Sequence, residues 1–188
     1  MAEDEVARLT LPVGTRDHAQ GAADAPVTLV EYGDYECPHC GRAHPVVKAL
    51  QRTLGKSLRF VFRNFPLKEA HPHAEHAAEA AESAGARGGE EKFWGMHDLL
   101  FENQGALEDS DLLEYAAALG IDPDGVAQDL ADGVHAARVR ADFRGGVRSG
   151  VNGTPTFFVN GRRYDGDWSD PAAFAAALRA FAHPGARR

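Results

Sequence analysis

Two cysteines, Cys37 and Cys40, are the only ones in the chain, and they stand three positions apart. A structural disulfide stabilises a fold by closing a long loop of the unfolded chain, and a bridge between these two residues would close almost nothing. The pair is therefore better explained by redox chemistry than by stapling of the fold. Pro38 and His39 separate the cysteines, which gives the motif Cys-Pro-His-Cys.

A helix is predicted directly after this motif, because apolar residues recur at helical spacing up to Leu54 and Gly55 is a stop signal. The first cysteine then lies at a helix N-terminus, where unpaired N–H groups and the helix dipole favour negative charge. Thiols at such positions have pKa values of roughly 3.5–7.5. We expect Cys37 to be the exposed nucleophile and Cys40 the more buried resolving thiol, with His39 adding positive charge when protonated.

Strands are predicted on both sides of this helix, over residues 27–32 and 58–63, where β-branched and aromatic residues dominate. Strand, helix and strand at this length form a βαβ unit with parallel strands and a right-handed crossover. Residues 9–13 fit a short edge strand, limited by Pro12, within an otherwise irregular leader over 1–25.

A helical block is predicted next. Its helices run over about Pro72–Ala84, Glu90–Asn103 and Asp111–Gly120, then from Asp122-Pro123 onward, and over about Val134–Val147. Glu114, three residues after Asp111, completes a capping pattern. Val139, Phe143 and Val147 are expected to share one face of the last helix of the block.

The chain returns to strands near its end. Residues 156–159 and 162–164 flank Asn160-Gly161, a two-residue turn that favours a β-hairpin. Asp170-Pro171 opens a last helix. Its inward residues are expected to be Phe174, Leu178 and Phe181. This order of elements predicts an α/β fold with a mixed β-sheet flanked by helices.

Composition narrows the class of protein. The chain has 188 residues, a net charge of −8 and 44% apolar residues, which suits one globular domain that does not bind nucleic acid. No apolar run approaches the ~20 residues of a membrane helix. The acidic N-terminus lacks the basic start and apolar run of a secretory signal, although a processed or mis-started gene would look the same. We therefore expect a cytoplasmic location and no membrane partner.

Residues 27–54, with Glu-Tyr-Gly-Asp-Tyr-Glu-Cys-Pro-His-Cys-Gly inside them, resemble the active-site segment of DsbA-like thiol–disulfide oxidoreductases. The resemblance covers nearly the whole chain. It implies a thioredoxin-like sheet with an all-helical insertion between the βαβ half and the C-terminal half of hairpin and helix. In these terms residues 1–188 form a single thioredoxin-like domain. Its parts are a leader (1–25), the βαβ half (26–66), the insertion (67–149) and the last loop, hairpin and helix (150–183).

The resemblance also implies catalytic roles around the cysteines. The Pro38-His39 dipeptide matches strongly oxidising members, in which a stable thiolate favours the reduced form. Glu31 occupies the place of the family's buried acid, which takes the proton of Cys40 during exchange. The catalytic set is thus Cys37, Cys40, His39, Pro38 and Glu31.

A second segment, Gly153-Thr-Pro-Thr-Phe157, resembles the family's loop whose proline is cis and faces the cysteine pair. Pro155 is then expected to be cis. Thr154, whose backbone would pair with an extended substrate peptide, stands where the best-known strong oxidant has valine. The resemblance thus implies that Thr154 and Pro155 bind substrate.

The function that follows is disulfide exchange with protein or peptide thiols and disulfides through a mixed disulfide. It needs an unidentified redox partner and no cofactor other than the redox-active Cys37–Cys40 disulfide. Alternatives are a cytosolic reductase or isomerase that uses the same pair, and a peptide-binding or holdase module. A glutathione-dependent transferase is less favoured, because such relatives usually carry serine in place of the pair.

Metal sites are weighed against these interpretations. Structural zinc needs about four ligands, and no second cysteine or histidine pair stands at motif spacing, even with His39 and His44 nearby. His71, His73 and His76 straddle a predicted helix start and need not share a face, so a polar first turn explains them. No metal is expected.

Overall fold

The computed structural model describes residues 7–182. Five strands form one sheet in the order β1-β3-β2-β4-β5. The strands are β1 (His18–Gln20), β2 (Val27–Gly33), β3 (Leu58–Asn64), β4 (Thr156–Val159) and β5 (Arg162–Tyr164). The α-helices are α1 (Pro38–Leu54), α2 (Ala74–Gly88), α3 (Glu90–Glu102), α4 (Asp109–Ala118), α5 (Pro123–Asp132), α6 (Ala136–Arg148) and α7 (Pro171–Ala182).

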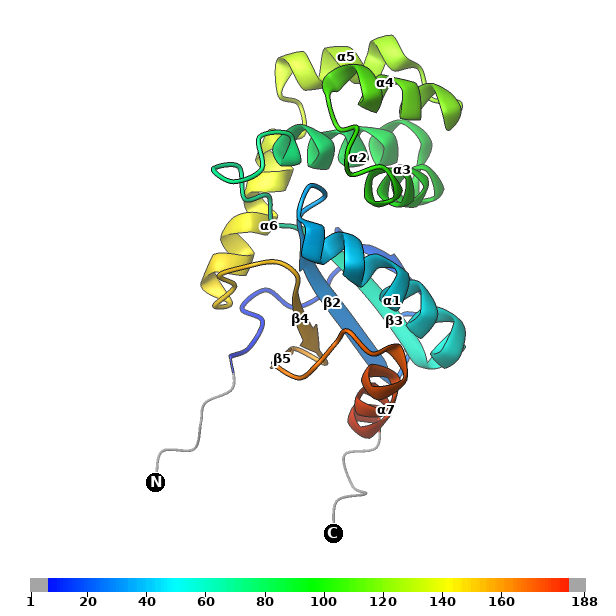
Figure 1. Ribbon diagram of the computed structural model, residues 1–188, viewed down its shortest axis with the longest axis vertical. Coiled ribbons are helices and arrows are strands. Elements are labelled where there is room, and N and C mark those ends of the chain that lie inside the picture. The colour runs from blue at the N-terminus through cyan, green and yellow to red at the C-terminus, as the bar shows by residue number, and fades with distance from the viewer. Residues whose placement is uncertain (1–6, 183–188) are drawn as a thin grey trace. The chain divides into compact units, whose positions relative to one another are not determined.

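Two compact units share these elements (Figure 1). The first contains the chain up to Tyr32, Arg42–Arg63 and the chain from Gly145 on, and it holds nearly all of the sheet. The second contains Gly33–Gly41 and Asn64–Arg144, and it holds α2 to α5. The predicted insertion over 67–149 therefore overlaps the second unit closely, and the cysteine motif groups with it.

The core of the first unit is its sheet. β2 has neighbours on both sides, and its residues Leu29 and Val30 are fully buried. Burial on both faces explains why this strand is a nearly continuous apolar run rather than an alternating one. β2 pairs antiparallel with β4, which sets Glu31 opposite Phe157. The strand predicted at 27–32 is confirmed, with one further residue.

The predicted edge strand at 9–13 is wrong. The preceding residue, Arg8, makes an isolated bridge with Arg162 of β5, and the edge strand next to β3 is β1. The carbonyls of Leu11 and Pro12 accept hydrogen bonds from the Arg63 guanidinium instead of a strand ladder, at 3.0 and 3.2 Å. Arg63 also binds both carboxylate oxygens of Asp17 and the hydroxyl of Tyr32. One buried side chain thus fixes the leader to β3.

The predicted hairpin is confirmed. β4 and β5 pair antiparallel around Asn160 and Gly161, whose φ angles are 49° and 78°. Both residues are left-handed, as the common two-residue hairpin turn requires. In α7, Phe174 and Leu178 are fully buried as expected, whereas Phe181 is only half-buried.

The second unit is built from helices that pack on one another, α2 on α3, α4 and α5, and α3 on α4 (Figure 1). Small side chains on α2 are buried and let its neighbours approach closely. They are Ala74, Ala77, Ala78, Ala80, Ala81 and Ala84. None of the helices within residues 7–182 is both long enough and apolar enough to cross a membrane.

Two details of the helical block differ from prediction. The capping box of α4 joins Glu108 and Asp111, so the helix begins at Asp109 and Glu114 lies in its interior. Val147 is 53% exposed, whereas Val139 is buried. Two steps of four residues turn an α-helix by about 80° beyond two full turns, which carries Val147 off the buried face.

Candidate active site

The cysteine motif begins α1. Cys37 immediately precedes the helix, and Pro38 is its first residue, a position that suits proline because no intrahelical N–H partner is lost there. The Cys37 carbonyl accepts a hydrogen bond from the Gly41 amide at 3.0 Å. The two cysteines are 4.0 Å apart and are not joined by a disulfide bond in the structure. Cys40 is fully buried and Cys37 is 4% exposed, so the expected order holds but Cys37 is far less exposed than predicted.

Asp34 organises the turn that leads into the motif. Its backbone N–H donates to Cys40 Sγ at 3.5 Å, and its carbonyl accepts from the Cys37 amide at 3.1 Å. Its carboxylate is buried and accepts from the amides of Glu36 and Leu67, both at 2.8 Å. Asp34 therefore contacts the Cys40 sulfur, the backbone of Cys37 and the loop after β3.

His71 joins the same carboxylate, with Nδ1 lying 2.8 Å from Asp34 Oδ2. Partial burial lowers the pKa of His71. The hydrogen bond and charge of Asp34 outweigh this effect, and the charges of Cys37 and Glu36 act in the same direction, so the pKa lies above its ordinary value. Because α2 begins only at Ala74, His71 belongs to the active-site loop rather than to a helix turn.

Gln104 holds the turn from a second direction. Its Nε2 donates to the carbonyls of Tyr35 and Cys37, both at 2.8 Å. A Cβ on Gly41 would lie 2.0 Å from Gln104 Oε1, so the glycine after the motif makes room for this amide. The absence of a side chain at Gly41 therefore allows Gln104 to approach the turn.

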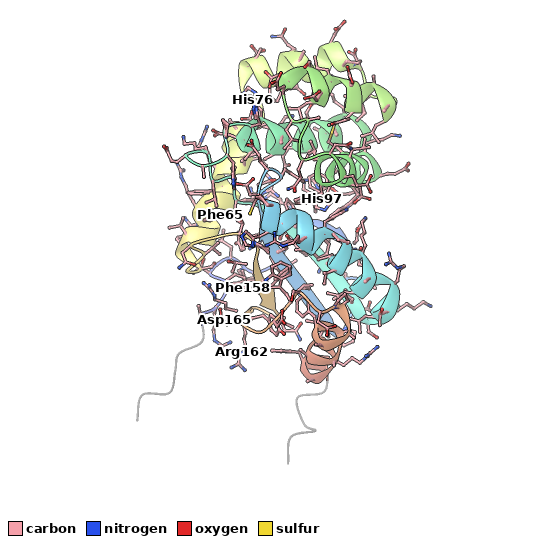
Figure 2. All side chains as sticks on the ribbon, in the orientation of Figure 1. Phe65, His76, His97, Phe158, Arg162 and Asp165 are labelled. Carbon is pink, nitrogen blue, oxygen red and sulfur yellow. The ribbon has the colours of Figure 1, made fainter. Side chains whose placement is uncertain are left out.

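An aromatic cluster lies beside the turn. The Tyr35 hydroxyl is 3.0 Å from Nδ1 of His97, a buried residue of α3 that Figure 2 labels. The rings of Trp94 and Phe101 meet His97 edge-on. This packing fixes Tyr35, two positions before Cys37.

The remaining predicted site residues lie in both units. Pro38 and His39 are exposed in the first turn of α1. Glu31 is 2% exposed in β2. The Thr154–Pro155 peptide bond is cis, as the resemblance implies, and both residues are half-buried just before β4. Glu31, Thr154 and Pro155 belong to the first unit and the cysteines to the second, and their catalytic and binding roles stay predictions.

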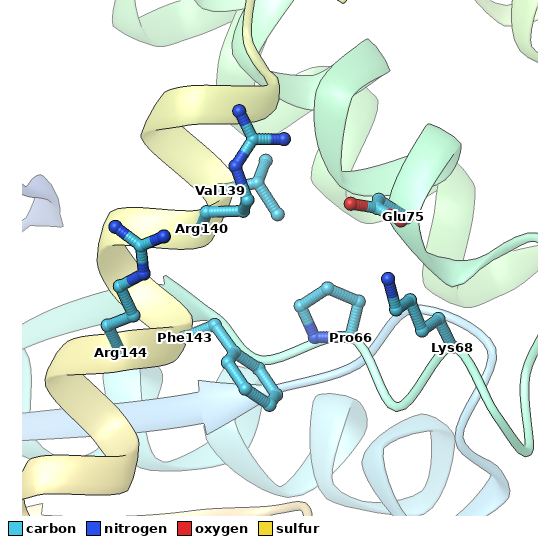
Figure 3. A pocket seen from close by; sticks show the side chains of 7 residues that line it. All are labelled: Pro66, Lys68, Glu75, Val139, Arg140, Phe143 and Arg144. Carbon is cyan, nitrogen blue, oxygen red and sulfur yellow. The ribbon is translucent and has the colours of Figure 1, made fainter.

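A separate cavity of about 270 Å³ lies within the second unit (Figure 3). Its lining combines an apolar floor with three basic side chains and one acidic side chain. The lining residues are Pro66, Lys68, Glu75, Val139, Arg140, Phe143 and Arg144. Neither cysteine lines it, so we do not include it in the active site.

The sequence of the chain from residue 14 to residue 180 matches the family model described as thioredoxin. The chain belongs to the thioredoxin family. The part outside the match is short, so the family accounts for both compact units.

Solved structures of similar fold match nearly the whole chain. BdbD from Bacillus subtilis, 24% identical, matches with a TM-score of 0.84 over 94% of this chain and 98% of its own. DsbA2 from Pseudomonas aeruginosa, 26% identical, has a TM-score of 0.73 over 94% and 99%. A thioredoxin-like oxidoreductase from Silicibacter pomeroyi, also 26% identical, has a TM-score of 0.74 over 88% and 93%. The predicted thioredoxin-like α/β fold and the resemblance to DsbA-like oxidoreductases are confirmed, and the protein is an oxidoreductase enzyme.

Curated proteins with higher sequence identity to this chain are named as Na⁺/H⁺ antiporters rather than oxidoreductases. The chain is 50% identical over 175 residues to a Na⁺/H⁺ antiporter, NhaA 1, of Salinispora arenicola, and 47% identical over 169 residues to one of a Mycobacterium species. These matches cover 93% and 88% of this thioredoxin-family chain. The chain spans about a quarter of the length of these relatives.

The prediction of a cytoplasmic location is wrong. Relatives 47–50% identical to this chain are named as Na⁺/H⁺ antiporters, a name that indicates a membrane-associated context. The prediction failed because it rested on the first residues of the chain alone, whereas the relatives extend far beyond the segment that they share with it.

Proposed function

We propose that this thioredoxin-family protein exchanges disulfides with protein substrates, with Cys37 as the attacking thiol and Cys40 as the resolving thiol. One observation carries the assignment. Cys37 directly precedes α1, while Cys40 one turn later receives the Asp34 N–H at its sulfur. A helix N-terminus stabilises a thiolate, and a second sulfur within reach completes the exchange.

The chemistry needs two displacements. The Cys37 thiolate attacks one sulfur of a substrate disulfide, the substrate S–S bond breaks, and one substrate thiolate leaves. The Cys40 thiolate then attacks Cys37 in this mixed disulfide and releases the second substrate thiolate. The substrate gains two electrons and the cysteine pair loses them, and the reverse sequence oxidises a substrate dithiol.

Three residues of the first unit complete the proposal. Glu31, buried in β2, takes the proton of Cys40, and burial suits a carboxyl group to that role. Thr154 offers its backbone to an extended substrate, with Pro155 beside it. The oxidisable pair itself carries the electrons, so we propose no further cofactor.

Single cysteine variants test the assignment. Cys37→Ser should abolish exchange with a peptide disulfide, because the attacking thiolate is gone. Cys40→Ser should accumulate a covalent protein–peptide adduct, visible by mass spectrometry and cleared by a small thiol, because the resolving step is missing. Exchange retained by Cys37→Ser would overturn the proposal.

The direction of exchange has its own measurement. The full chain is equilibrated in glutathione buffers, and the oxidised fraction of the Cys37–Cys40 pair gives the reduction potential. We expect an oxidising potential like that of DsbA, because helix and imidazole charges favour the thiolate. A potential near that of thioredoxin would assign the protein to disulfide reduction instead.

A further inference from the structure

We propose that His71 is a positioning residue that supplies the positive charge beside the Cys37 thiolate, with Asp34 holding its imidazole in place. The inference rests on the proposed function, because it names a residue that serves the same nucleophile. His39 inside the motif is exposed, whereas His71 is held by a buried carboxylate.

The hydrogen bonds around Asp34 show which nitrogen of His71 carries a proton. The Asp34 carboxylate meets three donors, the amides of Glu36 and Leu67 and the His71 ring. An ionised carboxylate only accepts hydrogen bonds, so His71 Nδ1 carries a proton in this arrangement. Protonation of the other ring nitrogen makes the ring an imidazolium, and the negative neighbour favours that state.

The loop that carries His71 is fixed to the turn at a second point. Glu36 Oε2 accepts from the amide of His73 at 2.7 Å, two residues after His71. With the Leu67 amide on Asp34, the loop is bound on both sides of the histidine. The ring therefore has a defined place relative to the turn from Asp34 to Cys37.

Charges in this turn favour the protonated form of His71, namely those of Asp34, Cys37 and Glu36, and each is negative when ionised. Coupling between two sites is reciprocal, so a thiolate that favours the imidazolium is itself favoured by it. Asp34 and Glu36 oppose a thiolate at Cys37, and the imidazolium adds to the helix N-terminus in offsetting their charge. The positive charge of His71 thus offsets the repulsion between the Cys37 thiolate and these carboxylates.

The pH profile of Cys37 alkylation tests the role without relying on exchange activity. His71→Asn should move the midpoint of the alkylation pH profile about one pH unit higher, because loss of an opposite charge raises the pKa of a thiol by at least about one unit. His71→Lys, which keeps a positive charge on the loop, should recover most of that shift. Mass spectrometry assigns the alkylated cysteine.

Two matched controls separate this effect from general changes of charge. Lys68→Gln removes a cation from the same loop, but Lys68 lines the separate cavity of Figure 3 and makes no hydrogen bond with Asp34. His76→Asn removes a histidine of α2 that pairs with Asp109 (Figure 2). Both should leave the profile unchanged. An equal shift of the midpoint in Lys68→Gln, or no recovery in His71→Lys, would contradict the proposal.

The unaltered protein provides a test that survives misfolding of a variant. The imidazole NMR titration of His71 is recorded with Cys37 reduced and again with Cys37 alkylated. Alkylation removes the thiolate, so the His71 midpoint should move to lower pH. An unmoved midpoint would refute the charge coupling, whereas failure of the exchange function would show separately as activity retained by Cys37→Ser.

Discussion

The turn from Asp34 to Cys37 is held by single polar side chains from distant parts of the sequence. His71 reaches Asp34 across 37 positions, and Gln104 reaches the Cys37 carbonyl across 67. The cysteine motif is local and was predicted from its spacing alone. These two partners have no local pattern, because their roles arise only when the loop after β3 and the turn after α3 fold against the segment from Asp34 to Cys37.

Gly41→Ala tests the close approach of Gln104. The added methyl would lie 2.0 Å from Gln104 Oε1 and should displace the amide from the Cys37 carbonyl. We expect the free energy of unfolding to fall by about 1–3 kcal/mol, the usual cost of overpacking, measured by urea denaturation. Gly105→Ala, where a Cβ meets nothing within 4 Å, is the control and should be near neutral. Equal effects of the two substitutions would refute the steric explanation.

Asp129 gives the protein an acid-dependent stability. Its hydrogen bonds with Arg87, and then with Ser83, lower the pKa of this carboxyl to about 2, against the opposing effect of burial. A lowered pKa in the folded state stabilises the protein above the unfolded value of 3.8, and the contribution is lost as pH falls toward about 2. Because Arg87 is partly exposed, we expect Asp129→Asn to cost only about 1 kcal/mol at neutral pH.

The measurement is urea denaturation of Asp129→Asn and the unaltered protein at neutral pH and near pH 2. The difference in unfolding free energy should shrink at the lower pH. A difference that stays constant would mean that the ionised carboxylate is not its source. Asp132→Asn, an exposed residue three positions later, serves as the control.

At the scale of elements, regular periodicity predicts well and short non-local pairing predicts poorly. The strand at 27–33, the helix after the motif and the hairpin around Asn160 all follow from residues that are neighbours in sequence. β1 has only three residues, and its partner β3 lies some forty positions away. Nothing in its own composition distinguishes it from a loop. The cap of α4 was misplaced because acidic residues crowd the segment 108–114, and several of them fit a capping pattern.

Arg63→Met tests the attachment of the leader to the sheet. The substitution leaves Asp17, a largely buried carboxylate, without its bidentate partner, and it releases the carbonyls of Leu11 and Pro12. Breaking a buried ion pair from one side typically costs ~3–5 kcal/mol, and we expect a loss of that size in urea denaturation. Arg59→Met on the same strand, where the side chain is half-buried, should cost less than about 1 kcal/mol. Similar losses would rule out the ion pair as the cause.

At the scale of the whole molecule, the second unit is not one stretch of sequence. It joins the nine residues Gly33–Gly41 to a segment that begins at Asn64. The resemblance to DsbA-like enzymes predicts an insertion over residues 67–149, whereas the second unit also contains the cysteine motif. The prediction of location from sequence was also wrong. It rested on the first residues of the chain, whereas the relatives are about four times as long as the segment that they share with it.

Because His71 and Gln104 hold the turn before α1, the cysteine motif depends on residues far from it in the sequence. A minimal protein made by excising residues 66–144 would keep both cysteines, the helix that follows them and every strand of the sheet. It would lack the donors that hold Asp34 and the Cys37 carbonyl. The motif alone is therefore not a transferable module, and grafting this enzyme onto another scaffold requires its helical segment as well.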